Sequence, residues 1–135
     1  MQERYLFKAK RKDNGEWIQG NLIIDETDDL KCFIGYIMGT DEDGIPHDID
    51  VVLVDPDTIC QCTGLKDKNG KLIWENDIVS YCDCTKEDYV IAWEQNKACF
   101  EYQEYSCSMM NFDELSGCEV EVIGNIFDNP ELLEE

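Results

Sequence analysis

Short alternations of apolar and polar residues run through most of the chain and predict a protein built mainly of β-strands. Tyr5, Phe7 and Ala9, for example, point to the side opposite Arg4, Lys8 and Lys10 in a strand, and an Asn-Gly pair at 14–15 precedes the next apolar segment. Successive side chains of a strand point to opposite faces, so this pattern predicts a sheet with one face in water. The segments that we expect to be strands are 4–10, 17–24, 31–38, 50–54, 64–66, 71–74, 77–82, 89–93, 97–102 and 119–127.

Helical patterns are confined to two short segments. Met109, Phe112 and Leu115 recur at helical spacing and predict a short helix over residues 108–115. Near the end of the chain, Asn129-Pro130 is typical of a helix cap followed by proline at the first helical position, which predicts a short tail helix.

Residues 55–80 contain two turn signals and two strand starts. Asn69-Gly70 is typical of a type I′ hairpin turn, which needs a positive φ at both central residues. Asn tolerates the left-handed conformation better than other non-glycine residues, so we expect a tight corner at Asn76 that redirects the chain into a new strand. In such a corner, the carboxylate of Asp77 is expected to accept backbone hydrogen bonds and not to catalyse a reaction.

The predicted fold class is mainly β. We expect an N-terminal β-sheet unit, residues 1–58, packed on a C-terminal SH3-like small β-barrel, residues 59–127, with a helical tail at 128–135 and one or two short helices in all. The barrel is inferred from five short strands, a helical excursion before the last of them, and the corner at Asn76. No flexible linker separates the two units, so we expect them to share a core.

Residues 64–79 read Gly-Leu-Lys-Asp-Lys-Asn-Gly-Lys-Leu-Ile-Trp-Glu-Asn-Asp-Ile-Val. This run resembles the motif of the YopX family of phage and prophage proteins, Thr-Gly-Leu-x-Asp-x-Asn-Gly, an apolar pair, then Glu-Gly-Asp-Ile-Val. Segments 7–9, 17–20 and 122–133 are similar to the ends of that family, so the resemblance spans nearly the whole chain. It implies a phage origin, a largely β fold and no assigned biochemical role. The motif residues with an expected structural role are Gly64, Asn69, Gly70, Asn76, which replaces the usual glycine, and Asp77.

The net charge of −20 is unevenly distributed over the 135 residues. Residues 1–20 contain five bases and three acids, a net charge of +2, so the remainder carries −22. No Lys or Arg follows Lys97. Such a protein repels nucleic-acid phosphate, and we expect no direct binding to nucleic acid. The acids either keep the protein soluble or, as a nucleic-acid mimic, dock a basic host or phage protein.

The chain has no apolar run of 18 residues, so we expect no membrane span. Its first residues, Met1-Gln2-Glu3-Arg4, lead into a strand pattern and not into the apolar region of a signal peptide. We therefore expect the protein in the cytoplasm of a bacterial host cell.

Eight cysteines include the pairs Cys60-x-Cys62 and Cys82-x-Cys84. Residues two apart on a strand share a face, so each pair could present two thiolates together. A structural zinc knuckle normally has two residues between its cysteines, which neither pair has. We expect no metal and no cofactor, and free, buried or half-buried thiols in a reducing compartment. The alternative is a small metal or redox protein that uses Cys60, Cys62, Cys82 and Cys84.

The sequence contains no recognisable catalytic set. His47 is the only histidine, and beside Asp48 and Asp50 we expect it to be an exposed loop residue and not an acid–base group. The acidic run at 41–44 lacks the glycine and glutamate positions of an EF-hand. Phosphate-binding glycine loops and serine nucleophile motifs are absent from the sequence. We predict that the protein is not an enzyme.

Aromatic residues crowd the predicted hairpin that ends near residue 105, where we expect Trp93 and Phe100 in the core. The neighbouring tyrosines and glutamates either form an acidic aromatic surface suited to Arg or Lys, or simply pack across strands. The candidate protein-binding residues are Glu101, Tyr102, Glu104 and Tyr105. Because exposed edge strands must be covered, we predict a non-catalytic protein-binding or assembly module that forms homo-oligomers.

Overall fold

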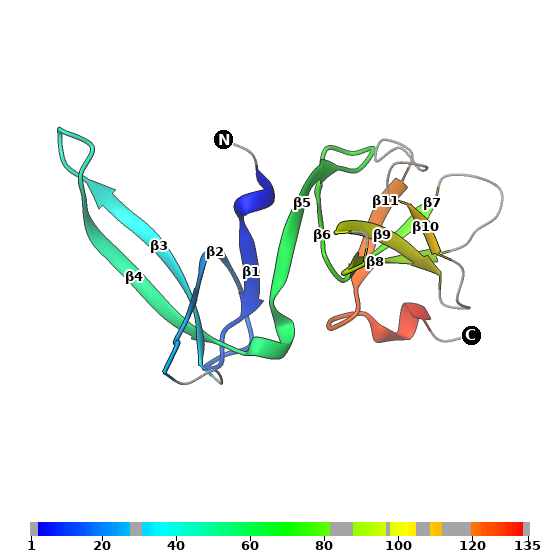
Figure 1. The fold of residues 1–135 in the computed structure, drawn as a ribbon, viewed down its shortest axis with the longest axis horizontal. Helices are drawn as coiled ribbons and strands as arrows, with labels where there is room; N and C mark the ends of the chain where they lie inside the picture. Colours follow the sequence, from blue (N-terminus) through cyan, green and yellow to red (C-terminus); the bar gives the residue numbers. More distant parts are fainter. Residues whose placement is uncertain are drawn as a thin grey trace. The chain divides into compact units, whose positions relative to one another are not determined.

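The computed structural model describes residues 3–27, 31–81, 88–96, 98–104, 109–111 and 120–133, and antiparallel strands make up most of them (Figure 1). Two units can be distinguished. The first unit comprises Arg4–Gln61, and the second unit begins at Cys62. Each has its own cluster of buried apolar side chains. The prediction of a mainly β protein is confirmed.

The first unit is built from four strands and the start of a fifth, which lie in the order β4-β3-β2-β1-β5. Two short 3₁₀ helices accompany them. The bounds are η1 Glu3–Tyr5, β1 Phe7–Lys10, β2 Trp17–Ile24, β3 Cys32–Thr40, β4 Pro46–Val54, η2 Pro56–Thr58 and β5 Cys60–Lys66. Strand β4 therefore begins in the segment 39–47, which the sequence analysis assigned to no strand.

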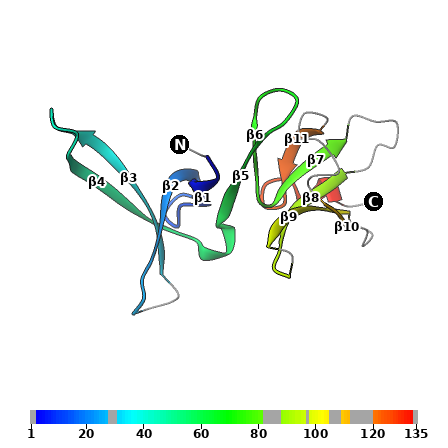
Figure 2. The same cartoon turned by 45° about the horizontal axis from the view of Figure 1, so that its top comes forward.

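The base of the first unit is closed because the end of β4 returns to β1. Arg11 forms an isolated bridge with Val54, and the backbone N–H of Asp55 donates to Lys10 O at 2.9 Å. Ala9, Cys32, Ile34 and Val54 form the buried cluster there, with Phe7, Ile18, Leu22 and Ile59 packed against it. Beyond Gly35, β3 and β4 continue away from this base as a two-stranded extension (Figure 2).

Strand β5 belongs to both units. Its first residues pair with β1, where Cys60 lies opposite Lys8 and Gln61 opposite Phe7. Its later residues pair with β6, where Cys62 lies opposite Trp74. The chain thus passes from one unit to the other within a single strand and not through a loop.

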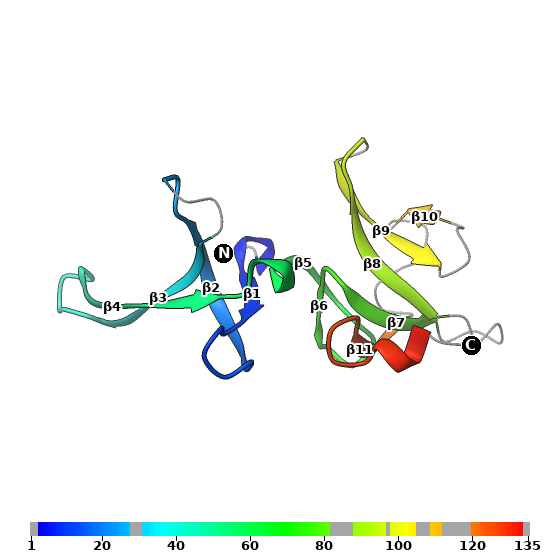
Figure 3. The same cartoon turned by 90° about the horizontal axis from the view of Figure 1, so that it is seen from below.

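The second unit contains a five-stranded antiparallel sheet in the order β10-β9-β8-β7-β11 (Figure 3). In the described strands this sheet is open, with β10 and β11 at its edges, so the closed SH3-like barrel that we predicted is not observed. The bounds are β6 Leu72–Trp74, β7 Asp77–Tyr81, β8 Asp88–Glu94, β9 Cys99–Glu104, β10 Met109–Asn111, β11 Val120–Asn125 and the 3₁₀ helix η4 Pro130–Leu133.

The core of the second unit lies on one face of this sheet. Its buried members are Ile73, Val79, Tyr89, Ile91 and Val120, and Phe100 and Val122 pack against them. Phe100 therefore contributes to the core as predicted. The prediction for Trp93 was wrong, because its side chain is 43% exposed. Trp93 lies near the turn of the β8–β9 hairpin, where it contacts the Phe100 ring edge-on at 5.1 Å between centroids and donates to Oε1 of Gln95 at 3.0 Å.

The two predicted helices differ from what is observed. Met109–Asn111 is strand β10, paired with β9 opposite Glu101–Gln103, so the helix predicted over 108–115 is wrong there, and its other residues lie outside the described ones. Antiparallel pairing with the preceding strand overrides the helical spacing of the apolar residues. The tail helix exists as the single 3₁₀ turn Pro130–Leu133. The Asn129 side chain accepts a hydrogen bond from Asn125 N instead of capping this turn.

The Asn-Gly turns occur where predicted, but with a different geometry. Gly70 has a φ of 82° and Gly15 a φ of 74°, whereas the φ of Asn69 and Asn14 is not positive, which excludes type I′ turns. Between β5 and β6, Gly70 N donates to Asp67 O at 3.0 Å. Asp67 itself stabilises this turn. Its Oδ1 accepts from Asn69 N and Lys71 N, both at 2.9 Å, and its Oδ2 accepts from Val122 N at 3.0 Å.

The corner between β6 and β7 agrees with its prediction. Asn76 has a φ of 71°, in the left-handed region. Its backbone N–H donates to Ile91 O at 2.7 Å, and its carbonyl accepts from Ile126 N at 3.1 Å. Oδ2 of Asp77 accepts from Trp74 N at 2.8 Å, which is the structural role expected for this carboxylate. The corner is therefore tied to two other segments of the second unit.

Candidate protein interface

The distal part of β3 and β4, residues 36–50, is a two-stranded extension that we call the ribbon (Figure 1). Strand β2 pairs with β3 only as far as Gly35, and within the described residues no other strand pairs with the ribbon. An isolated two-stranded hairpin is at best marginally stable in water. The ribbon is therefore a candidate for contact with a partner, because its strands are not covered by a third one among the described residues.

One side of the ribbon is apolar and exposed. Ile37 and Ile49 lie directly opposite each other. Ile37 is 54% exposed to solvent and Ile49 is 61% exposed. Val51 follows on the same side, because residues two apart on a strand share a face. The stripe continues towards β2, since Ile23 lies opposite Phe33 and Phe33 opposite Leu53.

Gly35 makes this apolar stripe continuous. A Cβ atom at Gly35 would lie 2.8 Å from Cδ1 of Ile23 and 3.8 Å from Cγ2 of Val51. The side chain of Ile23 thus crosses β3 in the space that any larger residue would fill. We refer to this stripe as the outer apolar face. It consists of Ile23, Phe33, Ile37, Ile49, Val51 and Leu53.

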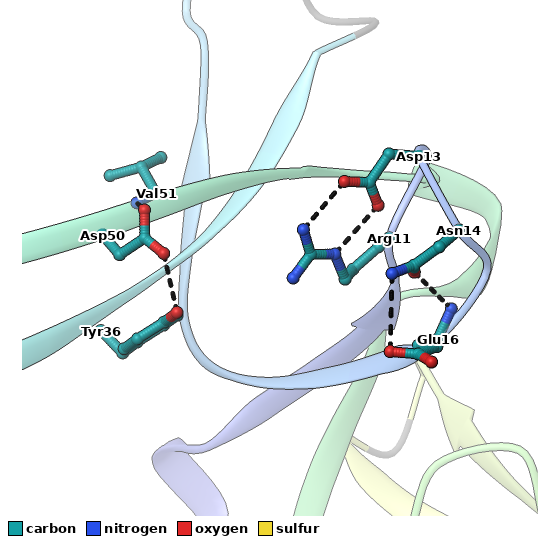
Figure 4. A network of polar contacts seen from close by, with 7 residues as sticks. All are labelled: Arg11, Asp13, Asn14, Glu16, Tyr36, Asp50 and Val51. Atoms are coloured by element: carbon teal, nitrogen blue, oxygen red, sulfur yellow. Dashed lines mark hydrogen bonds and ion pairs between the residues drawn. The ribbon is translucent and has the colours of Figure 1, made fainter.

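The opposite side of the ribbon is polar. The hydroxyl of Tyr36 donates to Oδ2 of Asp50 at 2.7 Å, and Oδ1 of Asp50 accepts from Val51 N at 3.0 Å (Figure 4). The hydrogen bond to Asp50 raises the pKa of Tyr36, and burial and the negative charge of Asp50 act in the same direction. The ribbon is therefore amphipathic, and only its outer side is suited to apolar contact.

The turn of the ribbon carries negative charge. Asp41 stabilises the turn, because its Oδ1 accepts from Asp43 N and Ile45 N, both at 2.9 Å. Glu42 and Asp43 are exposed beside it. The ribbon as a whole contains five acids and neither Lys nor Arg.

A basic patch lies at the other end of the first unit, on β1 and β2. The ammonium group of Lys8 lies 4.7 Å from the centre of the Trp17 ring, and that of Lys10 lies 5.4 Å from it. Cation–π contacts of this kind contribute about 0.5–1 kcal/mol each at exposed sites. In the adjoining turn, Arg11 forms two hydrogen bonds with Asp13 at 2.8 and 2.9 Å, which lower the pKa of Asp13 (Figure 4). We call Lys8, Lys10 and Trp17 the basic patch.

The acidic aromatic surface predicted around β9 is wrong for Glu101. This residue is 0% exposed, because it lies on a strand between β8 and β10, opposite Ala92 and Asn111. Tyr102 and Glu104 belong to β9, but their side chains are not among the described ones. Tyr105 lies outside the described residues.

The cysteine candidates are only partly placed. Cys60 and Cys62 are buried free thiols, as predicted, and Sγ of Cys60 donates to Thr58 O at 3.3 Å. Cys82 and Cys84 lie outside the described residues. Within the part of the chain that the structure describes, no group of three His, Cys, Asp or Glu side chains is arranged to hold a metal ion.

His47 and Asp48 are exposed on the ribbon, with Nδ1 and Oδ2 3.5 Å apart. His47 is therefore exposed beside acids as predicted, but it lies on strand β4 and not in a loop. Among the described residues, no helix has the length and apolar character needed to span a membrane.

Sequence reasoning missed the ribbon as a candidate interface. The signal was present, because Ile49, Val51 and Leu53 alternate with Asp48 and Asp50 at the spacing of a strand with one apolar side. We expected this strand to cover only residues 50–54, which is too short to extend beyond the sheet. Which side of that strand stays uncovered depends on where β2 stops pairing, and the sequence does not show this.

Comparisons with known proteins support the resemblance seen in the sequence. No curated protein matches the chain. A solved structure, the crystal structure of protein EF1440 from Enterococcus faecalis, is 28% identical and matches with a TM-score of 0.57 over 95% of this chain and 96% of that chain. The family model described as YopX protein matches residues 6–134. Because this match covers nearly the whole sequence, the chain belongs to the YopX family.

Proposed function

We propose that this protein is a non-catalytic protein-binding and assembly module that forms homo-oligomers through the ribbon. The observation that carries the proposal is the outer apolar face, which is about half exposed and continues from the sheet onto the two-stranded ribbon. A contiguous apolar patch on a soluble protein typically marks an interaction site. In keeping with the resemblance, we place this activity in the bacterial cytoplasm, in a protein of phage or prophage origin.

The contacts of the buried carboxylates in the second unit support a structural and not a catalytic role for these residues. Asp67 and Asp77, both buried, accept hydrogen bonds from backbone N–H groups. Such groups are held in place by the fold and are occupied as acceptors. A binding role for the protein needs no reactive side chain.

The energetic gain from covering the ribbon can be estimated. Burying a large aliphatic side chain completely contributes about 1.5–3 kcal/mol, and the side chains of the outer apolar face are about half exposed. Covering Ile23, Ile37, Ile49 and Val51 would thus contribute on the order of 5 kcal/mol. Association costs roughly 4 kcal/mol or more in lost freedom of motion. The apolar contact alone therefore supports a weak oligomer and needs additional polar contacts.

The test is the mass of the protein in solution at tens of micromolar, measured by size-exclusion chromatography with light scattering. We expect the wild type to be larger than a monomer. The variant Ile37→Thr/Ile49→Thr keeps two β-branched side chains in the ribbon but removes apolar area, so it should shift the population to monomer.

Leu65→Thr is the matched control, because Leu65 is exposed to a similar degree but lies on β5, outside the ribbon. It should leave the mass unchanged. A wild type that is strictly monomeric under these conditions would contradict the proposed function. Equal loss of association in the control and the ribbon variant would contradict the assignment to the ribbon.

A further inference from the structure

The two ends of the first unit carry opposite charge. The turn of the ribbon contains Asp41, Glu42 and Asp43, whereas β1 and β2 carry Lys8 and Lys10 beside Trp17. In all three views the turn of the ribbon lies away from β1 (Figures 1 to 3). The charge difference is marked because the whole chain carries −20 and residues 1–20 carry a net positive charge.

The basic patch and the outer apolar face lie on the same side of the sheet. Trp17 is paired with Lys10, and Gln19 with Lys8, so these four side chains share a side. Along β2 the same side continues through residues 19 and 21 to Ile23, which begins the outer apolar face. The outer surface of the first unit therefore carries the basic patch on β1 and β2, apolar side chains on β2, β3 and β4, and an acidic turn at the end of the ribbon.

This order of charge determines how two copies can stack. If two such sides meet with their ribbons pointing in opposite directions, each acidic turn approaches the basic patch of the other copy. If the ribbons point in the same direction, like charges meet. Two opposite charges 4 Å apart attract by about 1 kcal/mol in water and about 4 kcal/mol near a protein surface, and like charges repel by the same amounts.

We propose that the acidic turn of the ribbon docks on the basic patch of a second copy of the chain. The proposal rests on the self-association described above and names the surface that receives the ribbon. The apolar side chains of the outer apolar face supply the non-directional part of the contact. The pairing of Glu42 and Asp43 with Lys8 and Lys10 sets its orientation. Trp17 holds the two ammonium groups together, because both lie over its ring.

A charge exchange between two variants tests this contact. Variant A is Lys8→Glu/Lys10→Glu, and variant B is Glu42→Lys/Asp43→Lys. In variant A an acidic turn meets an acidic patch, and in variant B a basic turn meets a basic patch. Each alone should associate at least tenfold more weakly than the wild type in sedimentation equilibrium.

A mixture of A and B should recover association, because every turn then finds a patch of opposite charge. Labelling one variant with a fluorophore and following it by sedimentation velocity distinguishes this mixed species from either variant alone. Circular dichroism checks that both variants are folded. If variant A does not fold, Lys8→Gln/Lys10→Gln replaces it, and it should weaken association without the added repulsion.

The control is Lys66→Glu/Lys71→Glu, which changes the net charge as much as variant A but lies outside the first unit. It should associate like the wild type. A wild type that forms oligomers while folded A and B associate equally well would overturn this inference and leave the proposed function standing. Failure of the A and B mixture to recover association would also overturn it. The inference would also be overturned if the wild type bound a labelled oligonucleotide and variant A did not, because the basic patch would then bind nucleic acid. A monomeric wild type would overturn both proposals.

Discussion

Replacing Asp67 by alanine should lower the free energy of unfolding of the second unit by about 3–4 kcal/mol. Asp67 is only 5% exposed, and its carboxylate accepts three backbone hydrogen bonds. Two of them come from Asn69 and Lys71 in an exposed turn, where water can replace the lost acceptor, so each contributes about 0.5–1 kcal/mol. The third comes from Val122, a partly buried residue of β11, and a bond to a charged acceptor there contributes about 1.5–3 kcal/mol.

The measurement is urea unfolding followed by far-ultraviolet circular dichroism, with Asp41→Ala as the matched control. Asp41 also accepts two backbone hydrogen bonds in a hairpin turn, but it is exposed and lacks a long-range third bond. Asp41→Ala should therefore cost about 1 kcal/mol. Asp67→Asn should fall between the two, because one acceptor oxygen remains and the amide group faces an N–H donor.

The same carboxylate should make stability depend on pH. Burial favours the neutral form of Asp67, but the hydrogen bonds from Val122, Lys71 and Asn69 outweigh it, and its pKa is lowered. The charged form thus stabilises the folded state fully above the unfolded pKa of about 3.9, and this contribution is lost as the pH falls through the lower folded value. The difference between wild type and Asp67→Asn should be constant from pH 7 to 5 and shrink below pH 4. An Asp67→Ala variant as stable as Asp41→Ala, or a wild type and Asp67→Asn with parallel pH profiles, would refute this reasoning.

Three further outcomes are expected. Asn76→Gly should have a melting temperature within a few degrees of the wild type, whereas Asn76→Val should lower the free energy of unfolding by about 1–2 kcal/mol, because valine does not tolerate the left-handed φ. Equal melting temperatures of the two variants would contradict the role of the corner. Gly20→Ala should destabilise the fold by about 1–3 kcal/mol, because its new Cβ would lie 2.6 Å from the backbone oxygen of residue 35. Gly35→Ala should destabilise it less, because the new Cβ there meets the movable end of the Ile23 side chain, and the reverse order would be inconsistent with this packing. If the acidic surface docks a basic protein, pull-downs from bacterial lysate with nuclease present should enrich a basic protein at 0.1 M salt and lose it at 1 M, because the screening length falls from about 10 to about 3 Å. Capture that does not depend on salt would argue against docking by charge.

Features set by a few neighbouring residues could be predicted from the sequence. Asn76 is at a left-handed corner because its own backbone preference and the strands on either side agree. The positions of the Asn-Gly turns were predicted for the same reason. Their geometry was not, because the side chain of Asp67 binds the N–H groups of the turn and leaves only Gly70 with a positive φ.

Features set by the pairing of one strand with another could not be predicted. Glu101 carries the same carboxylate as the exposed acids Glu42 and Asp43, and its place between β8 and β10 buries it. Met109 has helical spacing to the apolar residues after it, yet it pairs with Gln103 as a strand. The candidate interface depends likewise on where β2 leaves β3 at Gly35, which separates the covered part of the hairpin from the ribbon.

The sharing of β5 has a consequence for how this protein can be divided or recombined. A gene segment that ends at residue 58 would deprive β1 of Gln61 and Cys60, its partners at Phe7 and Lys8. The resulting fragment would expose an unpaired strand edge of the kind that promotes aggregation. A cut after residue 66 would instead remove from β6 the strand that pairs with Trp74. Neither half is a self-sufficient module, so the two units are expected to be inherited and exchanged as one piece.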